Sequence, residues 1–298
     1  MPPTLATPGR TRPGDDREVL VRSVRGRVVL VTGASAGIGR AIAERLAAAG
    51  ATVVGCARDE ARLRAAARSV PGMQTLRCDV TSDEGRAALV ASVLAEHGHV
   101  DVLVNNAGIG WTGLVEQMGT EDVERLYATN VVALIDLTRR VLPGMLARHD
   151  GDVVMTSSAA AFVVLPPLTV YSSTKYAVDG FVEGLRREVW TRGVRVHSIN
   201  PGPVRTEWLA RSRGYEPAEG EPTSRFSPGI PAGWVAAAVE RSLQRPWPRT
   251  ASVPRVAGLG RLLAVQPLRS AVDLATGLSA GALGRAGRQL AASRLAPT

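Results

Sequence analysis

Two residues four positions apart, Tyr171 and Lys175, have side chains whose types and spacing could do chemistry. They bound the segment Tyr171-Ser-Ser-Thr-Lys175, and residues four apart share one face of a helix. Lys175 is the only lysine among the 36 basic residues of the chain, and the others are all arginine. Because a lysine ammonium is compact and has three rotatable donors, this position is predicted to need what a planar guanidinium cannot supply. The alternative is a chance surface lysine beside an ordinary tyrosine.

The segments around this pair alternate between strands and helices. The long helix is expected to break near Pro143, because proline disrupts a helix interior. The alternation predicts an α/β fold, a doubly wound parallel sheet with helices on both faces. Strands are predicted at 27–32, 51–56, 73–78, 100–104, 152–156 and 194–199, with an edge strand at 250–253, and helices at 40–49, 59–70, 82–96, about 120–147, from the Tyr171 segment to about 192, and 232–243.

A glycine-rich turn follows the first predicted strand. A sheet of this kind binds its ligand at the carboxyl ends of its strands. The sequence Thr32-Gly33-x-x-x-Gly37-x-Gly39 would let backbone N–H groups approach a pyrophosphate at the start of the next helix. Taken alone, the turn could also be a simple tight loop. The residues predicted to contact the cofactor here are Gly33, Ser35, Ala36, Gly37, Ile38 and Gly39.

The ends of the second and third strands concern the adenosine half of a dinucleotide. An NAD-preferring site usually has Asp or Glu after the second strand. This chain has Ala57 and Arg58 there, and Arg58 could pair with a 2′-phosphate, which favours NADP(H) over NAD(H). Arg58 could instead be a solvated charge. The glycine-rich turn has Ala36 before Gly37, so it offers no second basic side chain to a 2′-phosphate. Asp79 and Val80 are predicted to meet the adenine edge, although Asp79 alone fits a helix cap equally well.

Ligand-suited residues also follow the last three of the six strands. Asn105-Asn-Ala-Gly108 combines amides that can stabilise strand ends with a backbone that can pass close to a cofactor. Ser157-Ser158 follows the fifth strand, and the stiff turn 200–206 after the sixth is suited to a nicotinamide carboxamide. The predicted cofactor contacts in these segments are Asn106, Ala107, Gly108, Pro201, Gly202, Val204 and Thr206.

Over residues 26–255, these motifs together resemble the short-chain dehydrogenase/reductase family, whose domain is a Rossmann fold. The matching segments are Thr-Gly-Ala-Ser-Ala-Gly-Ile-Gly, Asn-Asn-Ala-Gly, Ser-Ser followed by Tyr-x-x-x-Lys, and Pro-Gly-Pro-Val-x-Thr. The glycine spacing is similar to the ordinary single-domain type and unlike the extended, sugar-nucleotide-modifying type. The spacing of Tyr171 and Lys175 is closer than in the enoyl-reductase branch. In this context the pair is interpreted as functional.

The resemblance implies four catalytic residues. Tyr171 would be the general acid that protonates a carbonyl oxygen. Lys175 would hold the nicotinamide ribose and lower the pKa of Tyr171, so both also contact the cofactor. Ser158 would hydrogen-bond the substrate oxygen, with Ser157 as the runner-up. Asn130 would anchor a water that relays protons to Lys175. The alanines after Ser158 stand where relatives often have a glycine, which is expected to reshape the pocket wall.

The implied activity is that of an NADP(H)-dependent oxidoreductase that interconverts a carbonyl and an alcohol by hydride transfer. The apolar segment 159–168 and a lid at about 206–233 favour a hydrophobic substrate, unless these residues merely pack the lid. A non-catalytic dinucleotide sensor or scaffold is the alternative from another class, but such proteins typically lose the tyrosine or lysine. A family epimerase or dehydratase is disfavoured by the glycine spacing. Apolar lid candidates are Trp208, Leu209, Tyr215 and Phe226.

The formal net charge of +9 belongs to the ends of the chain. Residues 241–298 hold nine arginines against Asp273 alone, and residues 1–25 hold five against three acids, so the remainder is nearly neutral. Nucleic-acid binding by the main domain is therefore not expected. The chain divides into a flexible leader (1–25), a catalytic domain (26–255) and a basic amphipathic, helical extension (256–298). The extension could be a cap or dimer partner, a peripheral membrane contact, or a loosely ordered tail.

The two cysteines, Cys56 and Cys78, do not make a disulfide framework, and no metal-ligand spacing joins them to the four histidines. They are predicted to be small buried hydrophobes in a reducing cytosol, and no metal is expected. The chain has no apolar stretch of signal-peptide type and none of membrane-span length, which predicts a cytoplasmic location. The family resemblance further implies a homodimer or homotetramer formed through two long helices.

Overall fold

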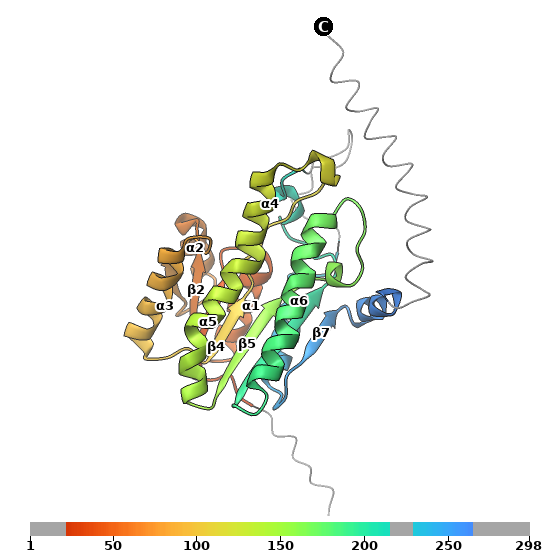
Figure 1. The fold of residues 1–298 in the computed structure, drawn as a ribbon. Coiled ribbons are helices and arrows are strands. Elements are labelled where there is room, and N and C mark those ends of the chain that lie inside the picture. Colours follow the sequence, from red (N-terminus) through yellow and green to blue (C-terminus); the bar gives the residue numbers. More distant parts are fainter. Residues whose placement is uncertain (1–21, 215–228, 265–298) are drawn as a thin grey trace, which may run out of the picture.

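A seven-stranded parallel sheet lies at the centre of the protein in the computed structural model, which describes residues 22–214 and 229–264 (Figure 1). The strand order is β3-β2-β1-β4-β5-β6-β7, and every neighbouring pair is parallel. All the predicted strands are present. They are β1 (Val28–Thr32), β2 (Thr52–Ala57), β3 (Gln74–Arg77), β4 (Val102–Asn105), β5 (Gly151–Thr156), β6 (Val194–Pro201) and β7 (Thr250–Val253).

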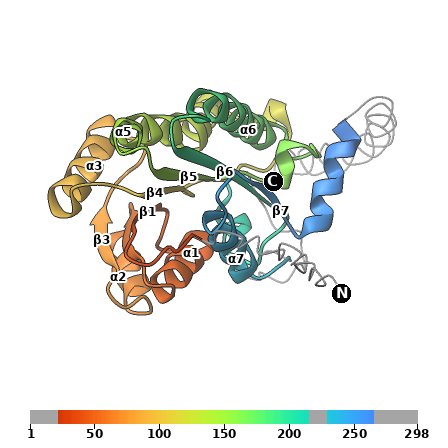
Figure 2. The ribbon, with the colours of Figure 1, turned by 90° about the horizontal axis from the view of Figure 1, so that it is seen from below.

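Helices cover both faces of this sheet, as predicted. In Figure 2, α3, α5 and α6 lie on one face and α1, α2 and α7 on the other. Side chains of β1 alternate between two apolar cores, because Val29 and Val31 pack on the α1 and α7 side while Leu30 packs on the α3 and α5 side. The helices are α1 (Gly37–Ala48), α2 (Glu60–Ala67), α3 (Asp83–His97), α4 (Thr120–Tyr127), α5 (Ala133–Ala147), α6 (Thr169–Val189) and α7 (Ala232–Leu243).

The long central helix does not break at Pro143, so that prediction is wrong. α4 continues through a π-helical turn at Ala128–Val132 into α5, and Pro143 lies inside α5. Burial of Val141 and Met145 against the sheet holds α5 on both sides of the proline. The irregularity occurs at the π-turn instead, which contains Asn130.

Parts of the predicted lid, leader and extension lie outside the described residues. These are residues 1–21, 215–228 and 265–298, and with them Tyr215 and Phe226. The extension begins as a 3-10 helix, η5 (Arg255–Ala264). Within the described residues, no helix has both the length and the apolar character needed to cross a membrane. Cys56 and Cys78 are buried and free, as predicted.

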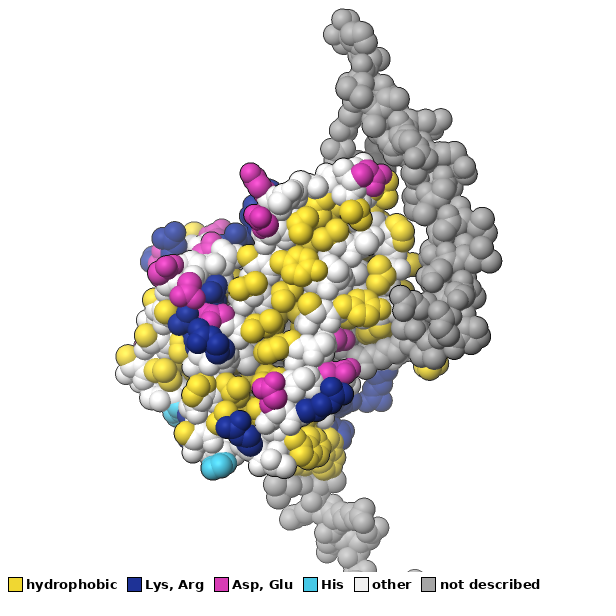
Figure 3. All heavy atoms as spheres, viewed as in Figure 1, with side chains coloured by type: hydrophobic (Ala, Val, Ile, Leu, Met, Phe, Trp, Pro, Cys, Tyr) yellow, Lys and Arg dark blue, Asp and Glu magenta, His cyan; other side chains and the backbone are white. Residues whose placement is uncertain are grey.

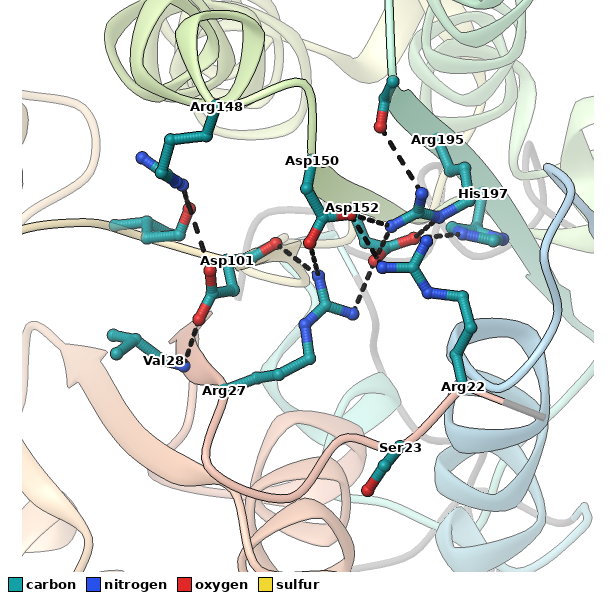
Figure 4. Close-up of polar contacts among 12 residues, drawn as sticks. Arg22, Ser23, Arg27, Val28, Asp101, Arg148, Asp150, Asp152, Arg195 and His197 are labelled. Carbon is teal, nitrogen blue, oxygen red and sulfur yellow. Dashed lines mark hydrogen bonds and ion pairs between the residues drawn. The ribbon is translucent and has the colours of Figure 1, made fainter. Parts of the chain in front are cut away.

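An ionic cluster ties the amino ends of the strands together around Asp152 (Figure 4). The fully buried carboxylate of Asp152 accepts hydrogen bonds from Arg27 Nη1 at 2.6 Å, Arg195 Nε at 2.8 Å and His197 Nε2 at 3.0 Å. Burial acts to raise the pKa of Asp152, but His197, Arg195 and Arg27 outweigh it and hold that pKa well below its usual range.

Asp152→Asn is expected to lower the free energy of unfolding at pH 7 by roughly 3–5 kcal/mol, because it removes the buried counter-charge of Arg27 and Arg195 and leaves them only the half-exposed Asp150. The stabilisation by the carboxylate is present above the ordinary Asp pKa of about 3.9 and is lost as pH falls through the lowered folded-state pKa. The difference between wild type and variant should therefore shrink in acid. Urea unfolding at pH 7 and at low pH measures both effects.

Asp150→Asn is the matched control for this substitution. Asp150 pairs with Arg22 at 2.7 Å and Arg195 at 2.9 Å, but its side chain is 45% exposed. Solvent screens these pairs, so the control should lose about 1 kcal/mol or less. Equal losses in the two variants would contradict a special role for the buried carboxylate.

Candidate active site

The glycine-rich turn after β1 fits a pyrophosphate. Gly33 and Gly37 have φ angles of +68° and +54°, which favour glycine. A Cβ on Gly39 would collide with the carbonyl oxygen of Gly33, so α1 can approach β1 only with glycine there. The N-cap residue of α1, Ala36, offers no side-chain acceptor to the first turn of the helix. Free N–H groups at such a helix start are suited to bind an anion.

Thr32, the last residue of β1, joins this turn to the end of β4. Its Oγ1 accepts hydrogen bonds from the backbone N–H groups of Asn106 and Ala107, each at 2.9 Å. Asn106 in turn donates through Nδ2 to the carbonyl oxygen of Thr32 at 3.0 Å. The predicted segment Asn106–Gly108 is thereby placed beside the glycine turn. Thr32 was not among the predicted site residues, although its position directly before Gly33 was a signal.

The predicted adenosine-side residues lie after β2 and β3. Arg58 is exposed and makes no ion pair with any described residue. Asp79 accepts hydrogen bonds from Thr81 N at 3.0 Å and Thr81 Oγ1 at 2.7 Å, next to the buried Val80. Burial acts to raise the pKa of Asp79, but the Thr81 bonds and nearby positive charge, including that of Arg58, give a net lowering. Arg58 and Asp79 are therefore electrostatic neighbours.

The segment that follows β6 contacts first the glycine-rich turn and then Tyr171. β6 ends at Pro201, the N–H of Gly202 donates to Val253 O at 2.8 Å, and Val204 is buried. The side chain of Thr206 is then the nearest neighbour of a Cβ built on Gly37. The turn predicted to hold cofactor contacts thus lies against the glycine-rich turn.

The next two residues, Glu207 and Trp208, contact opposite neighbours. Glu207 Oε2 accepts from Arg62 Nη2 of α2 at 2.6 Å, and the Trp208 ring lies 4.9 Å from the Tyr171 ring, centroid to centroid. These two contacts therefore hold the first residues of the predicted lid segment against α2 and against Tyr171. Sequence reasoning missed Arg62 and Glu207, because 145 residues separate them. The only signal was that Arg62 follows Arg58 by four positions.

Tyr171, Lys175 and Ser158 come together at the carboxyl ends of β5 and β6. The Tyr171 hydroxyl lies close enough to the Ser158 side chain for that serine to act on the Tyr171 pKa. Lys175 Nζ donates to the carbonyl oxygen of Thr156 at 3.1 Å and lies 5.6 Å from the Tyr171 ring centroid. Lys175 is only 6% exposed, so the alternative of a chance surface lysine is wrong.

The two serines after β5 have different surroundings. Ser158 caps the short 3-10 helix η3 (Ala159–Ala161) and reaches Tyr171. Ser157 is buried, and its Oγ donates to the backbone carbonyl of Lys175 at 3.4 Å. Of the two candidates, only Ser158 is thus seen in contact with the tyrosine.

Asn130 lies in the π-turn between α4 and α5. Its Oδ1 accepts from Ile109 N at 2.9 Å, and its Nδ2 donates to Ile109 O at 3.0 Å and to Thr174 Oγ1 of α6 at 3.2 Å. A Cβ on Gly108 would lie 3.3 Å from Asn130 Oδ1 and 3.9 Å from Lys175 Nζ. Gly108 therefore leaves room between the asparagine and the lysine.

Burial dominates the protonation of the central pair. It raises the pKa of Tyr171 to about 12, although the hydrogen bond with Ser158 acts to lower it. Burial also lowers the pKa of Lys175 to about 8, against the opposing charge of Asp179. The expected lowering of the Tyr171 pKa is therefore wrong for this structure, because desolvation of the phenolate prevails. Asp179, one helical turn after Lys175, was not among the predicted site residues.

Aromatic and aliphatic side chains surround Tyr171. Trp111, Leu126 and Ala160 form a buried cluster with it, and Leu168 and Trp208 pack against that cluster. Of the predicted apolar wall at 159–168, Ala160 belongs to this cluster and Leu168 packs against it. The middle residues of the wall, Val164 and Leu165, are exposed, and Phe162 and Val163 face Gly260 of η5.

The sequence and the fold of this chain are similar to those of known proteins. A family model described as short chain dehydrogenase matches residues 27–216. The bovine protein "Dehydrogenase/reductase SDR family member 7B" is 37% identical over 193 residues, which is 61% of this chain and 59% of that protein. A short-chain dehydrogenase from Streptomyces avermitilis has a TM-score of 0.72 at 34% identity, covering 86% of this chain and 99% of its own. A metagenomic short-chain oxidoreductase in complex with NADP has a TM-score of 0.65 at 31% identity, covering 77% and 96%.

Proposed function

This chain belongs to the short-chain dehydrogenase family, and we propose that it is an NADP(H)-dependent oxidoreductase that interconverts a carbonyl and an alcohol. The observation that carries the proposal is the convergence of Tyr171, Ser158 and Lys175 beside the glycine-rich turn. A nicotinamide dinucleotide, when bound, supplies or accepts the hydride. Residues of the turn at 33–39 would hold its pyrophosphate, and Lys175 its nicotinamide ribose.

Tyr171 is proposed to give its proton to the carbonyl oxygen. Burial raises the pKa of Tyr171 to about 12, so the phenol is protonated at neutral pH and suited to donate. Ser158 is proposed to hold the same oxygen by a hydrogen bond. Asn130 is proposed to keep Lys175 accessible to a proton-relaying water through its fixed position at Ile109.

The proposed substrate is a hydrophobic aldehyde or ketone. Support comes from the apolar cluster around Tyr171, whose polar neighbour is Ser158. The test is NADPH oxidation, followed by absorbance, against a panel of aldehydes, ketones and quinones. Turnover that rises with the apolar size of the carbonyl substituent is expected. NADPH binding without turnover of any carbonyl would count against an enzyme and favour a dinucleotide sensor.

Arg58→Asp is expected to shift cofactor preference from NADPH toward NADH by about ten-fold to a hundred-fold. The substitution would remove the charge-assisted hydrogen bond between the guanidinium and the 2′-phosphate. The new carboxylate would repel that phosphate and could instead accept hydrogen bonds from the ribose hydroxyls. The ratio of kcat/KM for NADPH and NADH, together with both dissociation constants, measures the effect. Arg68→Asp, an exposed change at the far end of α2 with the same charge, is the control. An unchanged ratio would remove Arg58 from the phosphate site.

The proposal extends to assembly and location. Apolar side chains gather on the face formed by α4, α5 and α6 (Figure 3), and they include the exposed Val132 and Tyr176. Such a patch supports a homodimer or homotetramer formed through these helices. Two buried free cysteines suit a reducing compartment, which supports a cytoplasmic location. The membrane contact predicted for 256–298 also remains a proposal.

A further inference from the structure

A groove of about 720 Å³ lies at the β7 edge of the sheet, between α7 and η5. Figure 2 shows these three elements together at that end of the molecule. None of the predicted cofactor or catalytic residues lines the groove. The lining residues that matter here are Trp234 and Arg241 of α7, Arg249, and Arg255 and Gly258 of η5.

The charged side chains that line this groove are all positive. Arg241, Arg249 and Arg255 line it, and none of them forms an ion pair with an acidic residue of the described part of the chain. Burial and the neighbouring positive charges of Arg245, Arg255 and Arg241 all lower the pKa of Arg249. Clustered arginines that lack acidic partners within the fold are stabilised when an anion binds among them.

An apolar stripe runs beside the groove. Val256, Leu259 and Leu262 are spaced three apart on η5, and residues three apart eclipse one another on a 3-10 helix. All three are more than half exposed, as are Trp234 on α7 and Trp247 in the connection to β7. Of the two tryptophans, Trp234 lines the groove. A tryptophan and aliphatic side chains beside arginines are the composition of helices that lie at an anionic membrane interface.

We propose that this edge docks on an anionic phospholipid surface. The arginine groove takes headgroup phosphates, and the η5 stripe with Trp234 lies at the boundary of the acyl chains. A second copy of the chain fits less well, because a two-fold contact would bring the same arginines of both copies together. A free phosphate compound would leave the apolar stripe without a role. This inference goes beyond the proposed oxidoreductase activity and does not depend on it.

The test uses the full chain and lipid vesicles of two compositions. We expect co-sedimentation with vesicles of one part phosphatidylglycerol to three parts phosphatidylcholine, and none with phosphatidylcholine alone. Because the contact is largely electrostatic at the surface, salt should weaken it. Equal binding to both vesicle types would overturn the proposal, since the arginines would then have no part in it.

Two matched triple variants locate the binding surface. Changing Arg241, Arg249 and Arg255 together to Gln should weaken binding to anionic vesicles by roughly a hundred-fold. Changing the exposed arginines 64, 68 and 77 to Gln alters the net charge equally at the opposite, β3 edge and should leave binding nearly unchanged. Thermal unfolding of both variants checks that they are folded. Equal loss in the two triples would mean general charge attraction and would overturn the proposal.

The apolar stripe is tested separately. Val256→Ser with Leu259→Ser should weaken vesicle binding several-fold, whereas Leu94→Ser with Val115→Ser, at exposed positions on other elements, should not. Two further results would overturn the proposal. One is dissociation of an oligomer by the Val256/Leu259 change, which would assign the edge to a second copy. The other is stabilisation by inorganic phosphate that the groove triple abolishes, without any vesicle binding.

Discussion

Tyr171→Phe is expected to lower kcat for carbonyl reduction by about 10²–10⁴-fold while leaving NADPH binding measurable. The substitution removes only the hydroxyl, whose hydrogen-bond partner is Ser158, and keeps the ring that packs against Trp208. The apolar packing of the buried cluster should therefore persist, and so should the fold. Single-turnover reduction and fluorescence titration with NADPH measure the two effects separately.

Tyr176→Phe is the matched control for this change. Tyr176 lies on the same helix, five residues further on, and its side chain is 45% exposed. Loss of its hydroxyl should leave kcat unchanged. Turnover by Tyr171→Phe at the wild-type rate would remove Tyr171 as the proton donor. Failure of the variant to bind NADPH would point to a structural defect instead.

Lys175→Arg is expected to lose most activity although it keeps the positive charge. Lys175 Nζ sits between Thr156 O at 3.1 Å and the tyrosine ring, and a Cβ on Gly108 would already come within 3.9 Å of it. A planar guanidinium is larger and holds its donors in a fixed fork, so it cannot take up the same contacts. A loss of about 10²-fold or more in kcat/KM is expected for an interaction that positions reacting groups.

The pH profile separates this role from a merely structural one. Burial lowers the pKa of Lys175 to about 8, so the ammonium is present below that pH and is lost above it. Reduction by the wild type should therefore decline above about pH 8, whereas the pKa of Tyr171 is too high to cause that decline. Arginine stays protonated throughout, so the residual activity of Lys175→Arg should lack the decline.

Arg187→Lys is the control for the exchange of these two side chains. Arg187 is an exposed arginine of α6 whose nearest acid is Glu183 at 3.5 Å. The reverse substitution there should change neither rate nor pH profile. A near-normal rate for Lys175→Arg would refute the argument from the compact shape of lysine.

The fold and much of the site could be predicted from the sequence, because their signals are local. Alternating β-branched runs and helices predict the parallel sheet, and a ligand site at its carboxyl ends follows from that topology. The spacing of Tyr171 and Lys175 predicts one helix face, and both lie on α6. The helix predicted at 82–96 also begins where expected, because Ser82 Oγ accepts from Gly85 N at 3.0 Å as the N-cap of α3.

Features that depend on distant contacts could not be predicted. The sequence left Ser157 and Ser158 as alternatives, and only the folded chain brings Ser158 to Tyr171. The rise in the Tyr171 pKa also needed the tertiary structure, because it comes from burial among side chains of several elements. Pro143 stays helical for a similar reason, since packing against the sheet outweighs local propensity.

The sequence by itself determined which residues could do chemistry and on which strand ends they stand. The tertiary structure alone decided which of them meet, and in what protonation state. Arg62 and Glu207 are 145 positions apart and pair at 2.6 Å, while Arg241, Arg249 and Arg255 gather in one groove. The physical reason is that motif spacing reflects the geometry of single elements, whereas sheet order and side-chain burial are set by packing across the whole domain.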